Sequence, residues 1–221
     1  MDHVVKILSI DQVTHDVRRF RFEKPRSYNF TPGQATDVSI NIPGWENELR
    51  PFTFTCLTKE SWLEFTIKIY EDHKGVTNEI GKLKVGEELI IRDVWGAIEY
   101  KGPGYFIAGG AGITPFLAIL RFLQKENKLE GNTLFFSNKT SKDIIVEKEL
   151  TAMLGKNVIY LLTKENNNQY HHGPIDERFL KSNIPDFKKH FYVCGPPKMI
   201  EDINTILTKL GASPDTVVFE K

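Results

Sequence analysis

The feature that most constrains the fold is a change of pattern near residue 101. Before it, short runs of alternating apolar and polar residues, rich in β-branched and aromatic side chains, follow one another between turns. These runs are VVKILSI, VRRFRFE, TDVSINI, FTFTC, LEFTIKIY and ELIIRDV. After the turn KGPG at residues 101–104, apolar runs alternate with helical patterns instead. The change indicates two domains with different folds.

The first pattern predicts a small antiparallel barrel or sandwich, interrupted by one helical stretch, GVTNEIGKL. In the second half the apolar runs are YFIAGG, TLFFSNK, NVIYLLTK, HFYVCG and TVVFEK, and the helical runs between them include TPFLAILRFLQKEN, DIIVEKELTAML and IDERFLKS. Apolar strands that alternate with helices form a parallel, doubly wound sheet. We therefore predict an N-terminal antiparallel β-barrel at residues 1–100, followed by a Rossmann-like α/β domain with a parallel sheet at residues 101–221.

The composition argues against several classes of protein. The 29 basic and 29 acidic residues balance, which disfavours a nucleic-acid partner. No run approaches the roughly 20 apolar residues of a membrane span, and the N-terminal MDHVVKILSID is charged too early for a signal peptide. The two cysteines, Cys56 and Cys194, form no metal-binding motif. The sequence thus predicts a cytoplasmic protein with no metal and no membrane span.

A glycine-rich turn follows the first strand of the second half, with the sequence Gly109-Gly110-Ala111-Gly112-Ile113-Thr114-Pro115. Glycines allow close backbone approach, and Thr114 and Pro115 suit the first positions of a helix. Unpaired N–H groups at a helix start form an anion site, and ligands bind at this edge of a parallel sheet. We predict that the turn binds a pyrophosphate; a tight connection that needs glycines only for packing is the alternative.

The turn lacks the GxGxxG pattern, and no acidic residue follows the second strand at a position suited to bind a ribose. Ser137, Asn138 and Lys139 stand there instead. A cation and hydroxyl groups suit an additional 2′-phosphate better than a bare ribose, although the same residues are ordinary in an exposed loop. The two explanations stay open at this point.

Four motifs, in this order, match one family. They are Arg50-Pro51-Phe52-Thr53, Gly75-Val76-Thr77, the turn Gly109 to Pro115, and Cys194-Gly195-Pro196-Pro197-Lys198-Met199, with Phe30-Thr31-Pro32-Gly33-Gln34 as further support. The chain resembles the ferredoxin–NADP reductase superfamily, close to the bacterial flavodoxin/ferredoxin reductases and the reductase modules of oxygenases. The resemblance covers nearly the whole chain and implies a flavin-binding barrel followed by a nicotinamide-nucleotide domain.

For the barrel, the resemblance implies that Phe52 stacks on the flavin, that Thr53 bonds to its ring, and that Arg50 binds its pyrophosphate. An arginine fork suits that anion. The other residues that it places at the flavin are Pro51, Lys68, Gly75, Val76 and Thr77. From the residues alone, Phe52 is equally a core side chain and Thr77 equally a helix N-cap.

For the second domain, the resemblance places Cys194 beside the nicotinamide, where its shape and polarizability matter rather than nucleophilic attack. A buried structural cysteine is the alternative. The nucleotide-binding residues that it implies are Gly109, Gly110, Gly112, Thr114, Pro115, Ser137, Lys139, Lys164, Tyr170, Gly195 and Pro196. Lys139 and Lys164 would contact a 2′-phosphate and Tyr170 would stack on adenine. Glu220 would direct a carboxylate towards Thr53, so the implied catalytic residues are Thr53, Cys194 and Glu220.

The predicted function is that of a flavin-dependent oxidoreductase. It would pass hydride from NAD(P)H, with NADPH favoured, to bound FAD (FMN is possible) and then single electrons to ferredoxin, flavodoxin or an oxygenase component. One alternative is a reductase that uses free flavin as a substrate. Another is a non-catalytic electron-transfer subunit of a larger complex. His171 and His172 are predicted to lie in a loop and to have no ligand role.

Overall fold

The computed structural model describes residues 1–96 and 98–219, and the chain divides into two compact units. Unit 1 comprises Met1–Gly96 and Thr114–Phe122, and unit 2 comprises the described residues of Ala97–Ile113 and Leu123–Lys221. Helix α2 (Thr114–Lys125) therefore contributes to both units. The division at residue 100, which assigns all of this helix to the second domain, stays a prediction.

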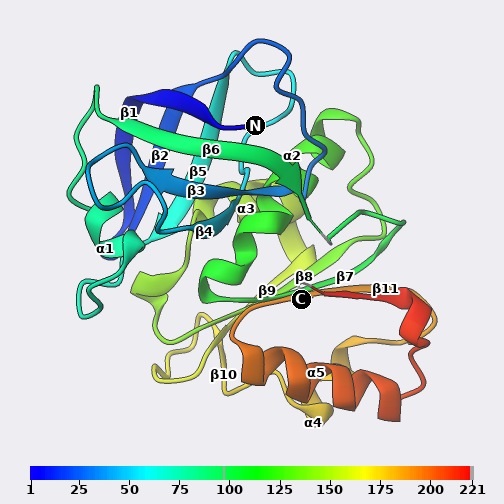
Figure 1. Ribbon diagram of the computed structural model, residues 1–221. Coiled ribbons are helices and arrows are strands. Elements are labelled where there is room, and N and C mark those ends of the chain that lie inside the picture. The colour runs from blue at the N-terminus through cyan, green and yellow to red at the C-terminus, as the bar shows by residue number, and fades with distance from the viewer. Residues whose placement is uncertain (97, 220–221) are drawn as a thin grey trace. The chain divides into compact units, whose positions relative to one another are not determined.

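Unit 1 contains an antiparallel sheet, as predicted (Figure 1). Its strands, among the described residues, are β1 (His3–Thr14), β2 (Val17–Glu23), β3 (Ala35–Ile40), β4 (Arg50–Thr53), β5 (Trp62–Lys68) and β6 (Glu88–Trp95), and the short helix α1 is Val76–Ile80. The strand order is β4-β3-β6-β1-β2-β5. A bridge between Phe54 and Phe65 joins the two ends of this order, which closes the sheet into a barrel.

The barrel interior follows from the period-two pattern of its strands. In β5, the core takes Leu63, Phe65 and Ile67, all almost fully buried, whereas Glu64 and Thr66 point to the outer face. These two outward polar residues are nevertheless buried. Residues outside the barrel core must therefore shield Glu64 and Thr66 from solvent.

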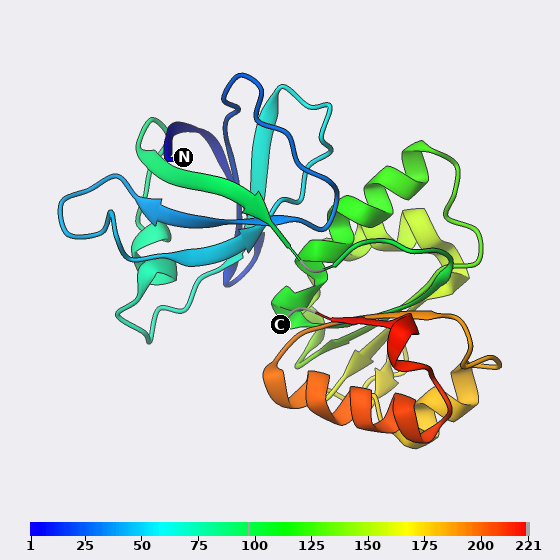
Figure 2. The same cartoon turned by 45° about the vertical axis from the view of Figure 1, so that its right-hand side comes forward.

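Unit 2 contains a parallel sheet, also as predicted, in the order β10-β9-β8-β7-β11-β12. Its described strands are β7 (Gly104–Gly109), β8 (Thr133–Asn138), β9 (Val158–Leu162), β10 (His171–His172), β11 (His190–Cys194) and β12 (Val217–Phe219). The helices that follow α2 are α3 (Glu147–Leu154), α4 (Glu177–Asn183) and α5 (Pro197–Lys209). Figure 2 shows α4 and α5 together on one side of this sheet. Among the described residues, no helix has the length and apolar character needed to cross a bilayer.

The core of unit 2 forms where α4 and α5 cover the sheet. Phe135 of β8 and Phe191 of β11 pack in one cluster with Phe179 of α4 and with Ile203 and Leu207 of α5. Burying each such side chain contributes about 1.5–3 kcal/mol. The sheet and these two helices therefore share one apolar core.

Three predicted boundaries differ from the structure. The run FTFTC corresponds to β4, which ends already at Thr53. The predicted helix DIIVEKELTAML begins only at Glu147, because Asp143 closes a capping box with Thr140 and Val146 takes a left-handed conformation with φ of 47°. His171 and His172 form the two-residue strand β10 rather than a loop. The start of α3 is set by local hydrogen bonding and β10 by pairing with β9, neither of which the hydrophobic pattern encodes.

Candidate functional site

The predicted flavin motif lies on β4, at one end of the strand order of unit 1. Arg50 is exposed, and its Nη1 donates to the Leu49 carbonyl at 2.7 Å. Within the described part of the chain, no carboxylate pairs with this guanidinium. Thr53 is only 7% exposed, and its hydroxyl has no hydrogen-bond partner among the described residues. The Arg50 guanidinium therefore has donors left for a ligand beyond its bond to Leu49, and the Thr53 hydroxyl has no bond to a described residue that a ligand would displace.

The strand keeps its alternation through the motif. The ring centroid of Phe65 lies 5.8 Å from that of Phe52 and 5.1 Å from that of Phe54. Both rings therefore point to the barrel core. Thr53 consequently points to the outer face. Phe52 is half-buried, which leaves part of its ring accessible while the rest packs in the core. Its core role is shown by these contacts, and its stacking role stays a prediction.

The second barrel motif lies at the start of α1. Gly75 is the N-cap, and the space around its Cα holds no atom that a Cβ would meet within 4 Å. Val76 anchors the helix start in the core. Thr77 lies inside the helix and is not the N-cap, so the alternative that this hydroxyl serves only as a cap is wrong.

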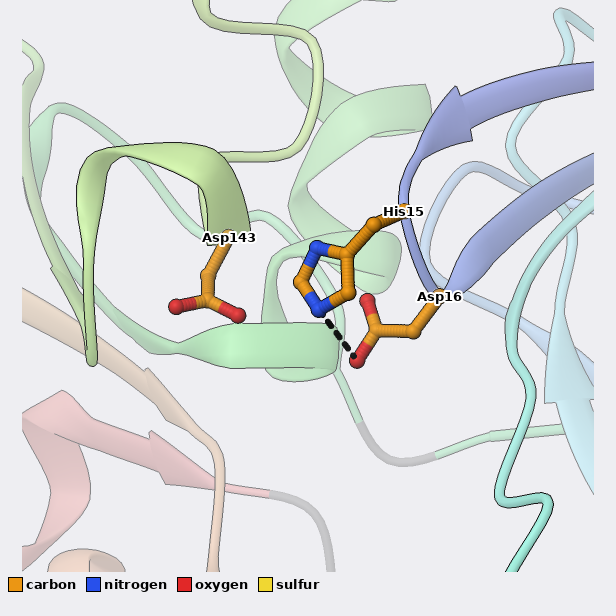
Figure 3. Close-up of side chains that lie close together, drawn as sticks. All are labelled: His15, Asp16 and Asp143. Atoms are coloured by element: carbon orange, nitrogen blue, oxygen red, sulfur yellow. Dashed lines mark ion pairs between the residues drawn. The ribbon is translucent and has the colours of Figure 1, made fainter.

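Lys68, at the end of β5, has a protein partner that the sequence does not reveal. Its ammonium bonds to the Asp16 carboxylate at 2.5 Å, and His15 lies 3.6 Å from the same carboxylate. Figure 3 shows the His15–Asp16 pair. Burial alone would raise the pKa of Asp16, but the hydrogen bond and charge of Lys68 lower it. The charge of Lys68 is thus engaged within unit 1, and its flavin role stays a prediction.

In unit 2, the two predicted nucleotide motifs contact each other through their glycines. A Cβ on Gly112 would lie 2.4 Å from the Cys194 carbonyl oxygen, and one on Gly109 would lie 2.6 Å from the sulfur of Met199. A Cβ on Gly195 would lie 2.7 Å from the Met199 methyl group. At Gly112 the obstructing atoms belong to the backbone, so the close approach of the two turns excludes a side chain there, whereas at Gly109 and Gly195 the nearest atoms belong to the flexible Met199 side chain.

Close packing accounts for the glycine at position 112, but it does not account for Gly110, and the choice between packing and pyrophosphate binding for this turn stays a prediction. Gly110 has a φ of +52°, and a Cβ placed on it would meet no atom within 4 Å, so this position faces open space. The turn 110–113 is a 3₁₀ helix that runs directly into α2, which begins at Thr114 and Pro115 as predicted.

Cys194 ends β11 and pairs in register with Ala108 of β7. It is buried, 4% exposed, and its side chain is a thiol rather than half of a disulfide. Pro196 is the N-cap of α5, and Pro197 begins the helix with its φ already suited to it. The motif thus places a cysteine, a glycine and the start of a helix at the same sheet edge as the glycine turn after β7.

The predicted nucleotide-choice residues lie at the ends of β8 and β9. The backbone N–H of Lys164 donates to the Lys139 carbonyl at 2.9 Å, so the two lysines are neighbours. Both side chains are exposed, and neither has an ion-pair partner within the described residues. Ser137 is half-buried on β8, beside Gly109 in register. The structure therefore brings together Ser137, Lys139 and Lys164.

Two acidic side chains that sequence analysis did not consider lie nearby. Glu165 accepts hydrogen bonds from the N–H and the hydroxyl of Ser141 at 2.8 and 2.9 Å, and these bonds lower its pKa. Glu147 accepts from the Tyr170 hydroxyl at 2.7 Å. Burial, together with this bond, raises the pKa of Tyr170 to about 12. Tyr170 is consequently held by its hydroxyl, and Glu165 places a negative charge next to Lys164.

A buried charge cluster in unit 1 was also missed. Glu64 accepts hydrogen bonds from Arg21 at 3.0 Å, from Arg121 at 2.9 Å and from Thr55 at 2.9 Å. One signal could have identified it, because Arg121 is the only basic residue among the apolar side chains of the stretch TPFLAILRF. Glu220, the remaining predicted catalytic residue, lies outside the described residues.

Comparison with known proteins gives consistent matches along the chain. An oxidoreductase FAD-binding domain model matches residues 4–100, and an oxidoreductase NAD-binding domain model matches residues 106–205. NADH-cytochrome b5 reductase 2-A of Vanderwaltozyma polyspora is 30% identical over 208 residues, which cover 86% of this chain and 70% of that protein.

Two further matches come from bacteria. The ferredoxin–NAD(P)(+) reductase component of the naphthalene 1,2-dioxygenase/salicylate 5-hydroxylase systems of Ralstonia sp. is 25% identical over 219 residues, covering 94% of this chain and 65% of that protein. The crystal structure of a ferredoxin NADP+ reductase from Neisseria gonorrhoeae with bound FAD and NADP superposes with a TM-score of 0.88. It covers 99% of this chain and 98% of its own at 19% identity, and it supports the fold alone.

Proposed function

Because the chain belongs to the ferredoxin–NADP reductase superfamily of NAD(P)H-dependent flavoprotein reductases, we propose that it takes hydride from NAD(P)H and delivers electrons singly to a carrier protein, with FAD as its resident cofactor. FAD, when bound, supplies the conversion of a two-electron hydride into single electrons. The observation that carries the proposal is on β4. Among the described residues, the exposed Arg50 side chain bonds only to the neighbouring Leu49 carbonyl, and the Thr53 hydroxyl has no hydrogen-bond partner.

The barrel residues fit FAD in charge and shape. Arg50 would bind the pyrophosphate, since an exposed guanidinium gives charge-assisted hydrogen bonds to an anion. The Thr53 hydroxyl would donate to or accept from the flavin ring, and the accessible part of Phe52 would stack on it. Gly75 leaves room for a phosphate beside the first N–H groups of α1, which have no acceptor inside the helix.

The residues of unit 2 would bind and orient NAD(P)H. The open side of Gly110 would admit the nucleotide pyrophosphate, followed by the start of α2 at Thr114 and Pro115. Cys194, fixed in β11, would pack against the nicotinamide, with Gly195 and Pro196 keeping the backbone close. From the family resemblance, we also propose that the Glu220 carboxylate would hold a proton near Thr53.

The electron acceptor is proposed to be a protein carrier such as ferredoxin, flavodoxin or an oxygenase component. The Ralstonia relative is named as the reductase component of an oxygenase system, and the Vanderwaltozyma relative is named for cytochrome b5. Cytochrome b5 is therefore added to the acceptors to be tested.

The function is tested by anaerobic reduction of the purified protein. We expect stoichiometric FAD whose absorbance is bleached by NADH or NADPH and restored by one of the carriers. Cys194→Ala should keep the FAD but slow its single-turnover reduction, because the nicotinamide loses its packing partner. Rates are measured by stopped-flow absorbance at equal FAD content.

Other outcomes identify the alternatives. A colourless protein that turns over only with added flavin would indicate a free-flavin reductase. Bound flavin that neither nucleotide reduces would indicate an electron-transfer subunit that works only within a complex. Cys194→Ala with the parent's reduction rate would return Cys194 to a purely structural role. Cys56→Ala is the matched control, because Cys56 is the other buried cysteine and lies in the barrel core.

Nucleotide choice is proposed to favour NADPH through Lys139 and Lys164. Two exposed ion pairs with a 2′-phosphate contribute about 0.2–1 kcal/mol each. Together they contribute about 0.4–2 kcal/mol, which favours NADPH by roughly two- to thirtyfold, with tenfold near the middle of that range. The charge of Glu165, next to Lys164, reduces this margin, and neither lysine offers the bidentate fork of an arginine.

We expect Lys139→Ala and Lys164→Ala each to lower the ratio of kcat/KM for NADPH to that for NADH. Glu165→Gln should raise the ratio, because it keeps an acceptor for Ser141 but removes the charge. Added salt should reduce every difference through screening. Steady-state kinetics with both nucleotides at low and high salt measure these ratios.

Lys156→Ala is the matched control for nucleotide choice, since this exposed lysine precedes β9 at the opposite end of the strand. It makes the same charge change without approaching Lys139. A parent that prefers NADH, or lysine variants whose ratio equals that of the control, would overturn the NADPH assignment.

A further inference from the structure

The side chain of Arg121 attaches helix α2 to the barrel strands. Arg121 Nη1 donates to the backbone carbonyl of Thr55 at 2.5 Å and to Glu64 Oε1 at 2.9 Å. All three residues lie in unit 1. Glu64 is 3% exposed, so the cover over the outward face of β5 is in part this helix.

The bond from Arg121 to the Thr55 carbonyl lies two residues after Thr53 in the same chain segment. Since Phe52 and Phe54 point into the core, Thr53 and Thr55 share the outer face. Thr55 Oγ1 donates to Glu64 Oε1 at 2.9 Å and lies 3.2 Å from Thr66 Oγ1. Arg121 thus holds the backbone two residues beyond Thr53, and the hydroxyl network holds the side chains.

The position of Arg121 is also linked to the start of α2, because both belong to one continuous helix. Arg121 follows Thr114 by seven residues, about two helical turns, so both lie on the same face of the helix. Thr114 directly follows the glycine turn at 110–113. A displacement of Arg121 relative to Thr55 would therefore also displace the helix start that the turn leads into.

Stability alone does not account for this cluster. Burial raises the pKa of Glu64, but the charge of Arg121 and the bonds from Arg21 and Thr55 lower it, so the carboxylate is ionised. Removing such a charge from water costs several kcal/mol, and buried ion pairs often stabilise a fold no better than apolar residues do. In some proteins a buried ion pair instead fixes one particular arrangement, and here the ion pair joins α2 to β5.

We propose that Arg121 is a positioning residue for hydride transfer, acting through Glu64 and the Thr55 carbonyl to fix the strand segment of Thr53 to α2. This inference rests on the proposed function. Its physical basis is that a misplacement of about 1 Å remote from the reacting atoms can slow a reaction about a hundredfold.

The test compares Arg121→Met and Arg121→Lys with Arg21→Met. Arg21 is the matched control, because its Nε donates to the same carboxylate at 3.0 Å but the residue belongs to β2 rather than to α2. Three quantities are measured: the limiting anaerobic rate of flavin reduction at equal FAD content, the rate of reoxidation by ferricyanide, and amide hydrogen exchange in the FAD-free proteins.

We expect Arg121→Met to slow flavin reduction roughly ten- to hundredfold while leaving reoxidation by ferricyanide unchanged. Arg121→Lys should retain more of the rate, because an ammonium keeps the charge and three donors. Exchange at residues 50–56 and 114–122 should accelerate in Arg121→Met. Arg21→Met should show the parent's reduction rate and the parent's exchange at 114–122.

Arg121→Met with the parent's reduction rate, or Arg21→Met slowed equally, would overturn the positioning role. If Arg121→Met does not fold, Arg121→Lys is compared with Arg21→Met by the same criteria. A parent that binds no flavin, or whose flavin neither nucleotide reduces, would instead overturn the proposed function, and this inference with it.

Discussion

Replacing Gly112 by alanine is expected to destabilise the protein by about 3 kcal/mol, the upper part of the usual range for forcing extra atoms into a packed site. The new Cβ would lie 2.4 Å from the Cys194 carbonyl oxygen and 2.6 Å from the Gly195 nitrogen. These are backbone atoms of a parallel strand end, so no flexible side chain can move aside. Thermal unfolding should shift downward by roughly 6 to 12 °C for a chain of this size.

Gly110→Ala is the matched control in the same turn. A Cβ there meets no atom within 4 Å, and the only cost is the left-handed φ of +52°, about 1–2 kcal/mol. The two variants therefore separate the cost of a clash from the cost of a conformation. Equal unfolding temperatures for both would contradict the close approach of the two turns.

The barrel strands were predictable because alternation is a local property. In β5, Leu63, Phe65 and Ile67 are apolar at every second position, and the structure buries them together in the core. The parallel sheet was predictable for a related reason, since its apolar strands alternate with helices along the chain. Fold class follows from patterns of this kind, which need no knowledge of partners far away in sequence.

The start of α3 was not predictable from that pattern. Ile144 and Ile145 continue the apolar rhythm, yet the helix begins at Glu147. The reason is that Asp143 accepts from the N–H and hydroxyl of Thr140 at 2.8 and 2.7 Å, which ends a separate short turn. A side chain that satisfies the backbone locally competes with helix formation.

The candidate site was predictable where a motif is contiguous in sequence. Cys194 to Pro197 can be read as one strand-to-helix turn, and the structure forms that turn. Contacts between distant residues were not accessible in this way. Lys68 pairs with Asp16, and Arg121 with Glu64, 57 residues away, only because the barrel brings these strands and α2 together. Charge in the sequence does not reveal which partner will neutralise it.

Replacing Arg50 by alanine is expected to weaken FAD binding roughly ten- to hundredfold, because a charge-assisted hydrogen bond contributes about 1.5–3 kcal/mol. The fold should be nearly unaffected. Arg50 is exposed, and among the described residues its side chain bonds only to the neighbouring Leu49 carbonyl. Surface substitutions of this kind usually change stability by about 0.5 kcal/mol or less. Affinity is measured by titrating the FAD-free protein and following the quenching of flavin fluorescence.

Two further variants make the result specific to Arg50. Arg26→Ala removes the same charge from another exposed arginine of the barrel unit and should leave FAD affinity at the parent's value. Arg50→Lys should retain part of the affinity, since an ammonium attracts the pyrophosphate but cannot bind two of its oxygens as a fork does. Because net charge changes equally in the two alanine variants, a loss shared by both would indicate only long-range attraction of an anion. Full affinity in Arg50→Ala would show that the pyrophosphate lies elsewhere and that the open guanidinium on β4 has another role.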